Sequence, residues 1–356
     1  MPRGARRRGQ PGVPAPRRPQ AAPSALQAYF QYGRSIEDKL DRAIGESDDQ
    51  AAPIAFAGWP DPQPGEDQPK ERPPGADLLV AFYGMSFSNQ MAEALKAAEP
   101  KVAVRKIGGP AAPPNHVMEM YEIDRGRHDA DVVVFTVLDS SVGGVLTIDG
   151  ACRNFEAPQP FMYRRYFATP EGLDAHEPPA RSLAEFREAW LDPEGRARLI
   201  DELLKWDLYY SPFYFRKNFL DESSLARMIR RALFRSHKQT ITGLYEEDGR
   251  FLEDSEAIRA LKGMVGRFID QARADGKRPL VLMVQDQASG SRLQDVLGPI
   301  VEARGALAFN TNAICPTSNR LNFVADGHFT PAANEKLAEA LAELLRRPPL
   351  ATADPG

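Results

Sequence analysis

The chain has 356 residues, enough for one large domain or for a domain with a subdomain. Hydrophobic residues make up 42% and charged residues 26%, which is typical of a globular protein with a substantial core. The net charge of −4 gives no reason to expect a nucleic-acid partner, and no apolar run reaches the roughly 18 residues of a membrane span.

The N-terminal segment is rich in arginine. Six arginines and no acidic residue occur among the first 20 residues, together with several prolines and glycines. This composition predicts a disordered tail over residues 1–25, with a functional basic arm as the alternative. No apolar core of a signal peptide can be read there, so the sequence itself gives no export signal.

Residues 26–75 are expected to lead into the main domain. A short amphipathic helix is predicted around Ser35–Ile44. The proline-rich stretch from Pro60 to Pro74 is typical of a linker or of an arm lying on the domain. The main domain is predicted over residues 76–348, followed by a short tail at 349–356.

From residue 78 onward, fully apolar strands alternate with helices. Strands are predicted at 78–83, 102–107, 132–138, 279–284 and 306–310, and helices at 87–98, 115–123, 291–302 and 331–347. Thr330 is a good N-cap for the last helix, with Pro331 at its first position. Because strands that are apolar throughout are buried on both faces, the pattern predicts a parallel sheet covered by helices on both sides.

The alternation is interrupted at about 153–276, where a helical insertion is predicted. Helical stretches are expected near 182–205, 222–238 and 254–274, and aromatic residues are dense at 161–167 and 206–219. These aromatic residues suit the core of a helical subdomain, and the alternative is a surface that binds sugar rings or acyl chains. With either role, an insertion of this length shapes the cleft beside it.

Two cysteines, Cys152 and Cys315, are present, without the spacing of a zinc site. We expect two free thiols if the protein is cytoplasmic, with a single disulfide as the alternative. The glycine motifs of nucleotide-phosphate sites are also absent from the sequence.

Ser86 lies where the strand at 78–83 passes into a helix, within the segment Gly-Met-Ser-Phe-Ser-Asn at 84–89. At such a junction the hydroxyl is exposed at the carboxyl edge of the sheet, and the backbone N–H points out from the helix N-terminus. This position suits both a nucleophile and an oxyanion donor. The alternative is that Ser86 only caps the helix, although Ser88 could take that role instead.

His328 lies just before the final helix, two residues after Asp326. In an extended turn, residues two apart can face the same side, so the carboxylate could orient the imidazole. A serine hydroxyl is a poor nucleophile until a histidine accepts its proton. Ser86, His328 and Asp326 are therefore the predicted catalytic residues.

These two junctions resemble blocks of the SGNH/GDSL hydrolase family. Residues 84–88 are similar to its first block, with Met85 in place of the usual aspartate, and residues 326–328 are similar to its last block. Gly109 falls where the second block supplies a glycine. The resemblance covers about residues 76–347 without the insertion. It implies an α/β fold, a flavodoxin-like three-layer α/β/α sandwich with a parallel five-stranded sheet.

The third block of that family normally supplies an asparagine to the oxyanion hole, and here it does not. The predicted strand at 132–138 is followed by Asp139 and Ser140. The expected oxyanion donors are therefore the backbone N–H groups of Ser86 and Gly109, with Asn115 or Ser140 as substitutes. For Asn115 the alternative is a helix N-cap.

The resemblance implies a serine esterase that needs no metal or cofactor. It points to small acyl esters, O-acetyl esters of carbohydrates among them, as substrates, and to the cell envelope as the location. A polysaccharide O-acetyltransferase with the same triad is an alternative. A non-catalytic polysaccharide-binding protein with the same fold is the other. The oligomeric state is left open.

Overall fold

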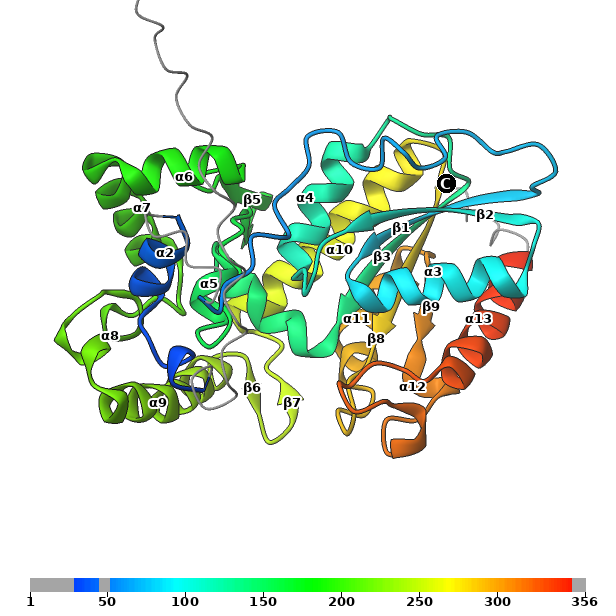
Figure 1. The fold of residues 1–356 in the computed structure, drawn as a ribbon. Coiled ribbons are helices and arrows are strands. Elements are labelled where there is room, and N and C mark those ends of the chain that lie inside the picture. Colours follow the sequence, from blue (N-terminus) through cyan, green and yellow to red (C-terminus); the bar gives the residue numbers. More distant parts are fainter. Residues whose placement is uncertain (1–28, 45–51, 348–356) are drawn as a thin grey trace, which may run out of the picture.

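The computed structural model describes residues 29–44 and 52–347 (Figure 1). The tails predicted at 1–25 and 349–356 lie outside the described residues.

The central sheet has five parallel strands in the order β2-β1-β3-β8-β9 (Figure 1). They are β1 (Leu78–Gly84), β2 (Val102–Gly108), β3 (Val132–Leu138), β8 (Arg278–Val284) and β9 (Leu307–Asn310). Every residue of β3 is buried, as expected for a central strand covered on both faces. The predicted strands match the observed ones to within one residue at each end, because mostly apolar runs mark buried parallel strands clearly, even in β2 with its Arg105 and Lys106.

Helices cover both faces of this sheet. Helices α3 (Ser86–Ala98) and α13 (Pro331–Arg346) pack together on one face. Helices α4 (Pro114–Asp124), α10 (Glu256–Ala274) and α11 (Arg292–Ala303) cover the other. The architecture is thus the expected flavodoxin-like three-layer sandwich. The chain leaves β1 toward β2 and leaves β3 toward β8, so the point where the strand order reverses lies between β1 and β3.

Helix α10 falls within the range 153–276 predicted as an insertion, but it packs on the sheet. The ring of Phe268 lies 4.8 Å from that of Tyr121 on α4 and 5.2 Å from that of Phe135 on β3. A parallel crossover from β3 to β8 requires a covering helix, and α10 supplies it.

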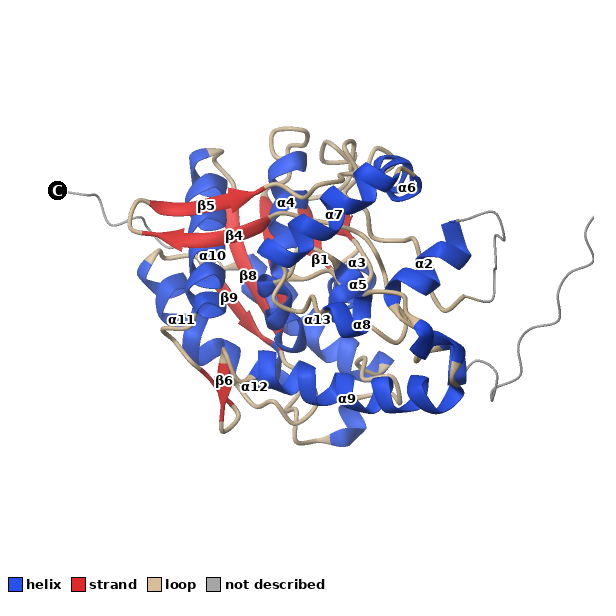
Figure 2. Ribbon diagram, turned by 90° about the vertical axis from the view of Figure 1, so that its left-hand side faces the viewer, coloured by secondary structure: helices blue, strands red, loops and turns tan. Residues whose placement is uncertain are grey.

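The remaining elements between β3 and α10 form a mixed subdomain. They are η1 (Asp139–Leu146), α5 (Gly150–Arg153), β4 (Arg165–Thr169), β5 (Gly172–His176), α6 (Leu183–Leu191), α7 (Pro193–Trp206), α8 (Pro212–Phe215), η2 (Phe219–Glu222), α9 (Ser224–Thr242), β6 (Glu246–Glu247) and β7 (Arg250–Phe251). The two hairpins were not predicted. The β4–β5 hairpin lies on α10 (Figure 2). The helix predicted near 182–205 is interrupted at Asp192, which caps α7 ahead of Pro193.

Most aromatic residues of the subdomain belong to its core. Trp190, Tyr166, Tyr209 and Phe215 are each 1% exposed. This burial favours the packing role for these aromatic residues over a ligand-binding surface.

The lead-in helix α2 (Ile36–Ile44) is held to this subdomain by buried polar groups. Asp221 accepts hydrogen bonds from the backbone N–H of Ser35 (2.7 Å) and from its hydroxyl (3.0 Å). The same carboxylate pairs with Arg230 at 2.5 Å, and both of these side chains are 0% exposed. We call Ser35, Asp221 and Arg230 the anchor cluster.

The proline-rich stretch lies on the sheet edge as an arm. Arg105 of β2 donates hydrogen bonds to the carbonyls of Pro64 and Gly65, each at 2.8 Å, and pairs with the buried Asp124. Arg105 thus bonds both to backbone carbonyls of the arm and to a buried carboxylate. These contacts explain how the arm is fixed without secondary structure of its own.

Cys152 and Cys315 are both free and buried, which agrees with the expectation of two thiols. Within residues 29–44 and 52–347, none of the helices combines the length and apolar character needed to span a bilayer.

Candidate active site

Two glycines make room at the sheet edge where Ser86 emerges. A Cβ on Gly84 would lie 2.6 Å from the Cβ of Ser88 and 2.7 Å from the Cβ of Thr136. A Cβ on Gly108 would collide with the carbonyl oxygen of Gly84. Only glycine lets β1, β2 and the start of α3 approach this closely.

Ser86 is the first residue of α3 and does not cap it. The N-cap is Met85, whose backbone is extended (φ −121°, ψ −162°) and whose side chain makes no capping bond. The hydroxyl of Ser88 is not a cap either, because it accepts a hydrogen bond from Thr136 at 3.0 Å. The half-buried hydroxyl of Ser86 is therefore available for another partner.

That partner is His328. Its Nε2 lies 2.7 Å from Oγ of Ser86, across 242 positions of the sequence. The imidazole stacks on the ring of Phe87, with ring centres 4.6 Å apart and planes 23° from parallel. Phe87 thus fixes the plane of the imidazole, a role that sequence patterns alone did not indicate.

The loop before α13 is shaped to present His328. The carbonyl of His328 accepts a hydrogen bond from the N–H of Val324 at 2.8 Å. Gly327 has a positive φ of 90°, which a residue with a side chain would adopt only with strain. Thr330 caps α13 by accepting from the N–H of Ala333, so the predicted cap is confirmed.

Asp326 orients the histidine. One carboxylate oxygen lies 3.1 Å from Nδ1 of His328 and also accepts the backbone N–H of His328 at 3.1 Å. These hydrogen bonds, first that of the backbone and then that of the ring, hold the pKa of Asp326 below its ordinary value. Since an ionised carboxylate only accepts, Nδ1 carries the proton, and Nε2 is left as the acceptor for the hydroxyl of Ser86.

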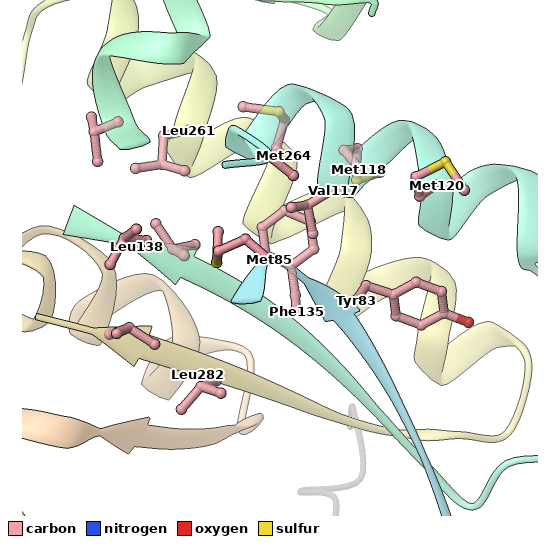
Figure 3. Packing of buried hydrophobic residues seen from close by; sticks show 14 of the residues in the cluster. Tyr83, Met85, Val117, Met118, Met120, Phe135, Leu138, Leu261, Met264 and Leu282 are labelled. Carbon is pink, nitrogen blue, oxygen red and sulfur yellow. The ribbon is translucent and has the colours of Figure 1, made fainter. Parts of the chain in front are cut away.

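Met85, where the resemblance to the SGNH/GDSL family led us to expect an aspartate, is a core residue. It is 1% exposed, and its side chain lies among Phe135, Leu138 and Met264 (Figure 3). An aspartate in this apolar surrounding would lack a partner for its charge, so methionine suits the local packing.

The expected oxyanion donors have different surroundings. Gly109 directly follows Gly108, which pairs with Gly84 across β1 and β2, so Gly109 lies at the same sheet edge as Ser86. Asn115 is fully buried in the first turn of α4, where its amide donates to the carbonyl of Val145 at 3.3 Å. It is not the N-cap of α4, because that residue is Pro113.

The backbone N–H of Ser140 is already used. It donates to the carboxylate of Asp286 at 2.6 Å, and the carbonyl of Ser140 accepts from Arg153. The structure therefore does not leave this N–H free as an oxyanion donor.

An ion-pair network fixes the exit of β3. The buried carboxylate of Asp139 accepts from Nε of Arg292 at 2.8 Å. Arg292 also pairs with Glu246 at 2.8 Å and covers the ring of Phe251 at 4.6 Å. Burial raises the pKa of Asp139, and Arg292 opposes that shift. This network was not foreseen, since Asp139 and Arg292 lie 153 positions apart in the sequence.

His116 is a buried packing residue behind Gly109. Its Nε2 donates to the carbonyl of Gly58 at 2.8 Å, and burial lowers its pKa to about 4. A Cβ on Gly109 would lie 3.3 Å from both Cα of Gly58 and Cε1 of His116. This neutral histidine supports the glycine loop and does not act as a second base.

Across the described part of the chain, no group of three or more histidine, cysteine, aspartate or glutamate side chains is arranged to hold a metal ion. Comparison with known proteins finds no family model and no curated protein that matches this chain.

Proposed function

We propose that this protein is a serine-dependent hydrolase of small acyl esters, similar in chemistry to the SGNH/GDSL hydrolases. The observation that carries the proposal is the 2.7 Å separation of Oγ of Ser86 and Nε2 of His328, with Asp326 on the other ring nitrogen. A hydroxyl, an imidazole and a carboxylate in this order form the unit that activates a serine in acyl transfer.

In the proposed reaction, Oγ of Ser86 attacks the ester carbonyl carbon while Nε2 of His328 accepts the hydroxyl proton. The C–O bond to the leaving alcohol then breaks, and His328 returns the proton to that oxygen. Water attacks the resulting acyl-serine, again losing a proton to His328. The acid is released when that proton returns to Oγ of Ser86.

The negative oxygen of the tetrahedral intermediate needs donors at the same edge. The first N–H groups of a helix have no acceptor within the helix, and the N–H of Ser86 is the first of α3. We assign this N–H, together with that of Gly109, to the oxyanion. Without a side-chain amide in addition, the hole would be weaker by about 10²–10³ in rate than one with a further donor.

The open surroundings favour small acyl groups over large buried ones. The side chain of His328 is 26% exposed and that of Asp326 69% exposed, so the acyl-serine is accessible from solvent. The resemblance to the SGNH/GDSL family adds carbohydrate O-acetyl esters as the first substrates to test and the cell envelope as the location. An acetyltransferase would use the same acyl-serine with a sugar hydroxyl in place of water.

The test is acetate release from p-nitrophenyl acetate and from an O-acetylated oligosaccharide, with and without an unacetylated oligosaccharide as acceptor. Ser86→Ala should lower the rate by about 10⁴ or more. Ser88→Ala, two residues away, is the matched control and should keep most of the activity. Acetyl groups recovered on the acceptor would identify a transferase. Equal rates for wild type and Ser86→Ala would contradict the proposal.

A further inference from the structure

Helix α9 presents an apolar face to solvent. Leu225, Met228, Ile229 and Leu233 are 66%, 42%, 50% and 45% exposed, and their spacing of three or four residues places them on one side of the helix. Phe219, in the turn before α9, is 83% exposed. We call these five residues the α9 face.

Helix α9 differs from an ordinary surface helix because it carries apolar residues on its outer side as well as on its inner side. An ordinary surface helix turns its apolar side to the core and its charges to water. Here the inward side includes Arg227 and Arg230, and Arg230 is fully buried against Asp221. The inner side also buries Phe234 and Ile241, so the apolar residues of the α9 face are additional to those that pack inward. A group of neighbouring apolar side chains on an otherwise polar surface is typical of an interaction site.

Helix α9 itself carries side-chain charges of one sign, although Glu222 just before it is exposed and Glu156 pairs with Arg231. The sequence of α9 contains five basic residues and no acidic one, although the whole chain has a net charge of −4. Arg235 and Lys238 are exposed on this helix. Apolar residues combined with basic ones are the composition of segments that bind the surface of anionic membranes.

The basic N-terminal segment joins the described structure next to α9. The guanidinium of Arg231 lies 4.5 Å from the ring centre of Tyr29 and 5.4 Å from that of Tyr32. Residues 1–28, which precede Tyr29, contain six arginines and no acidic residue. Their only large apolar residues are Met1, Val13 and Leu26, too few to cover the α9 face. The sequence that leads to Tyr29 is therefore rich in positive charge and poor in large apolar residues.

We propose that the α9 face docks on the surface of an anionic lipid bilayer. Helix α9 lies at the periphery of the molecule in both views (Figures 1 and 2), so a flat surface can reach it. The apolar side chains enter the boundary between headgroups and acyl chains, and the basic groups face lipid phosphates. A second copy of the chain fits less well, because a symmetric contact would bring like charges together.

The experiment is co-sedimentation of the full-length protein with vesicles. One set contains phosphatidylcholine alone, and the other contains equal parts of phosphatidylcholine and phosphatidylglycerol. Wild type should bind the anionic vesicles and lose most of that binding at high salt. The variant Leu225→Gln/Ile229→Gln/Leu233→Gln should bind about tenfold or more weakly, because each leucine or isoleucine contributes apolar area to the contact.

The matched control is Leu191→Gln/Leu204→Gln, which changes two leucines that are 60% and 65% exposed on α6 and α7. It should bind like wild type. Arg6→Gln/Arg7→Gln/Arg8→Gln should reduce binding to anionic vesicles only.

Failure of wild type to bind anionic vesicles would overturn the proposal. So would a dimer in sedimentation equilibrium that the triple glutamine variant converts to monomer, because the face would then belong to a second copy. The Ser86→Ala protein should bind vesicles normally, so this result is independent of the proposed esterase activity.

Discussion

The triad and the anchor cluster are both polar groups assembled from distant parts of the chain, and they differ in exposure. In the anchor cluster, Asp221 accepts from Ser35, from Arg230 and from the N–H of Asn218, with no exposed side-chain surface. In the triad, the side chain of Asp326 is 69% exposed, and the hydroxyl of Ser86 is half-buried. One cluster is closed, and the other is open to solvent.

This difference in exposure predicts that the anchor cluster stabilises the fold and that the triad contributes to the proposed reaction. A buried carboxylate that is fully paired cannot lose a partner without leaving a charge unsatisfied, so it holds the structure together. An exposed pair adds little to stability, because water replaces its partners easily. In the proposed reaction, an exposed pair of this kind can give up a hydrogen bond within the protein and form one with the substrate instead. Substitutions in the anchor cluster should therefore change unfolding, and substitutions in the triad should change rate.

The largest expected effect is that of His328→Asn on catalysis. Without a base, Ser86 keeps its proton, so kcat/KM for p-nitrophenyl acetate should fall by about 10⁴ or more. The free energy of unfolding should change by less than about 1 kcal/mol, measured by urea denaturation. If His328→Asn lost much stability and kept its activity, His328 would have a structural role and not the catalytic role proposed for it.

Asp221→Ala should have the opposite profile. Removing this carboxylate leaves Arg230 buried without its partner, which costs about 3–5 kcal/mol in the free energy of unfolding. The activity of the protein that remains folded should be unchanged. Glu253→Ala is the control, because its ion pair with Lys262 is exposed and should leave the urea midpoint almost unaltered. Equal midpoints for both variants would argue against an anchoring role.

His116 provides a pH test of the buried support behind Gly109. Its pKa is about 4 in the folded chain and 6.5 ordinarily, so the unfolded chain binds a proton first as the pH falls. Stability from this residue is complete above pH 6.5 and declines toward pH 4, by about 3 kcal/mol. His116→Gln lacks this titration. The difference between the two urea-unfolding curves should therefore shrink as the pH is lowered. A constant difference would mean that His116 titrates normally.

Asp326→Asn should have the smallest effect on rate among the triad positions. The amide can no longer favour the reactive tautomer by its charge, but water screens the exposed carboxylate that it replaces. We expect kcat/KM to fall by about 10- to 100-fold. A loss as large as that of His328→Asn would show that the carboxylate is less screened than its exposure indicates.

The sequence was informative where local patterns determine structure. Mostly apolar runs predicted all five strands of the central sheet, although β2 contains Arg105 and Lys106. The junctions after β1 and before α13 indicated Ser86 and His328, which the structure brings together. Their approach follows from the topology, because parallel strands gather their carboxyl ends at one edge.

Features that depend on distant partners could not be predicted. The capping role considered for Ser86 depended on where α3 starts, and the surroundings of Ser140 depended on Asp286 from the loop after β8. From the sequence, Arg230 would be predicted to lie on the surface, because α9 is a basic helix. Its burial depends on the contact with Asp221, which also binds Ser35 of the lead-in segment. Which apolar residues of α9 lie on its outer side could not be recognised from periodicity, because periodicity does not distinguish the inner from the outer side.

The most direct test of the triad is covalent labelling with a fluorophosphonate, followed by mass spectrometry of the peptides. A serine activated by His328 should form an adduct on Ser86, and none should form there in His328→Asn. Wild-type protein that stays unlabelled, or an adduct confined to another serine, would contradict the assignment of Ser86 as the nucleophile.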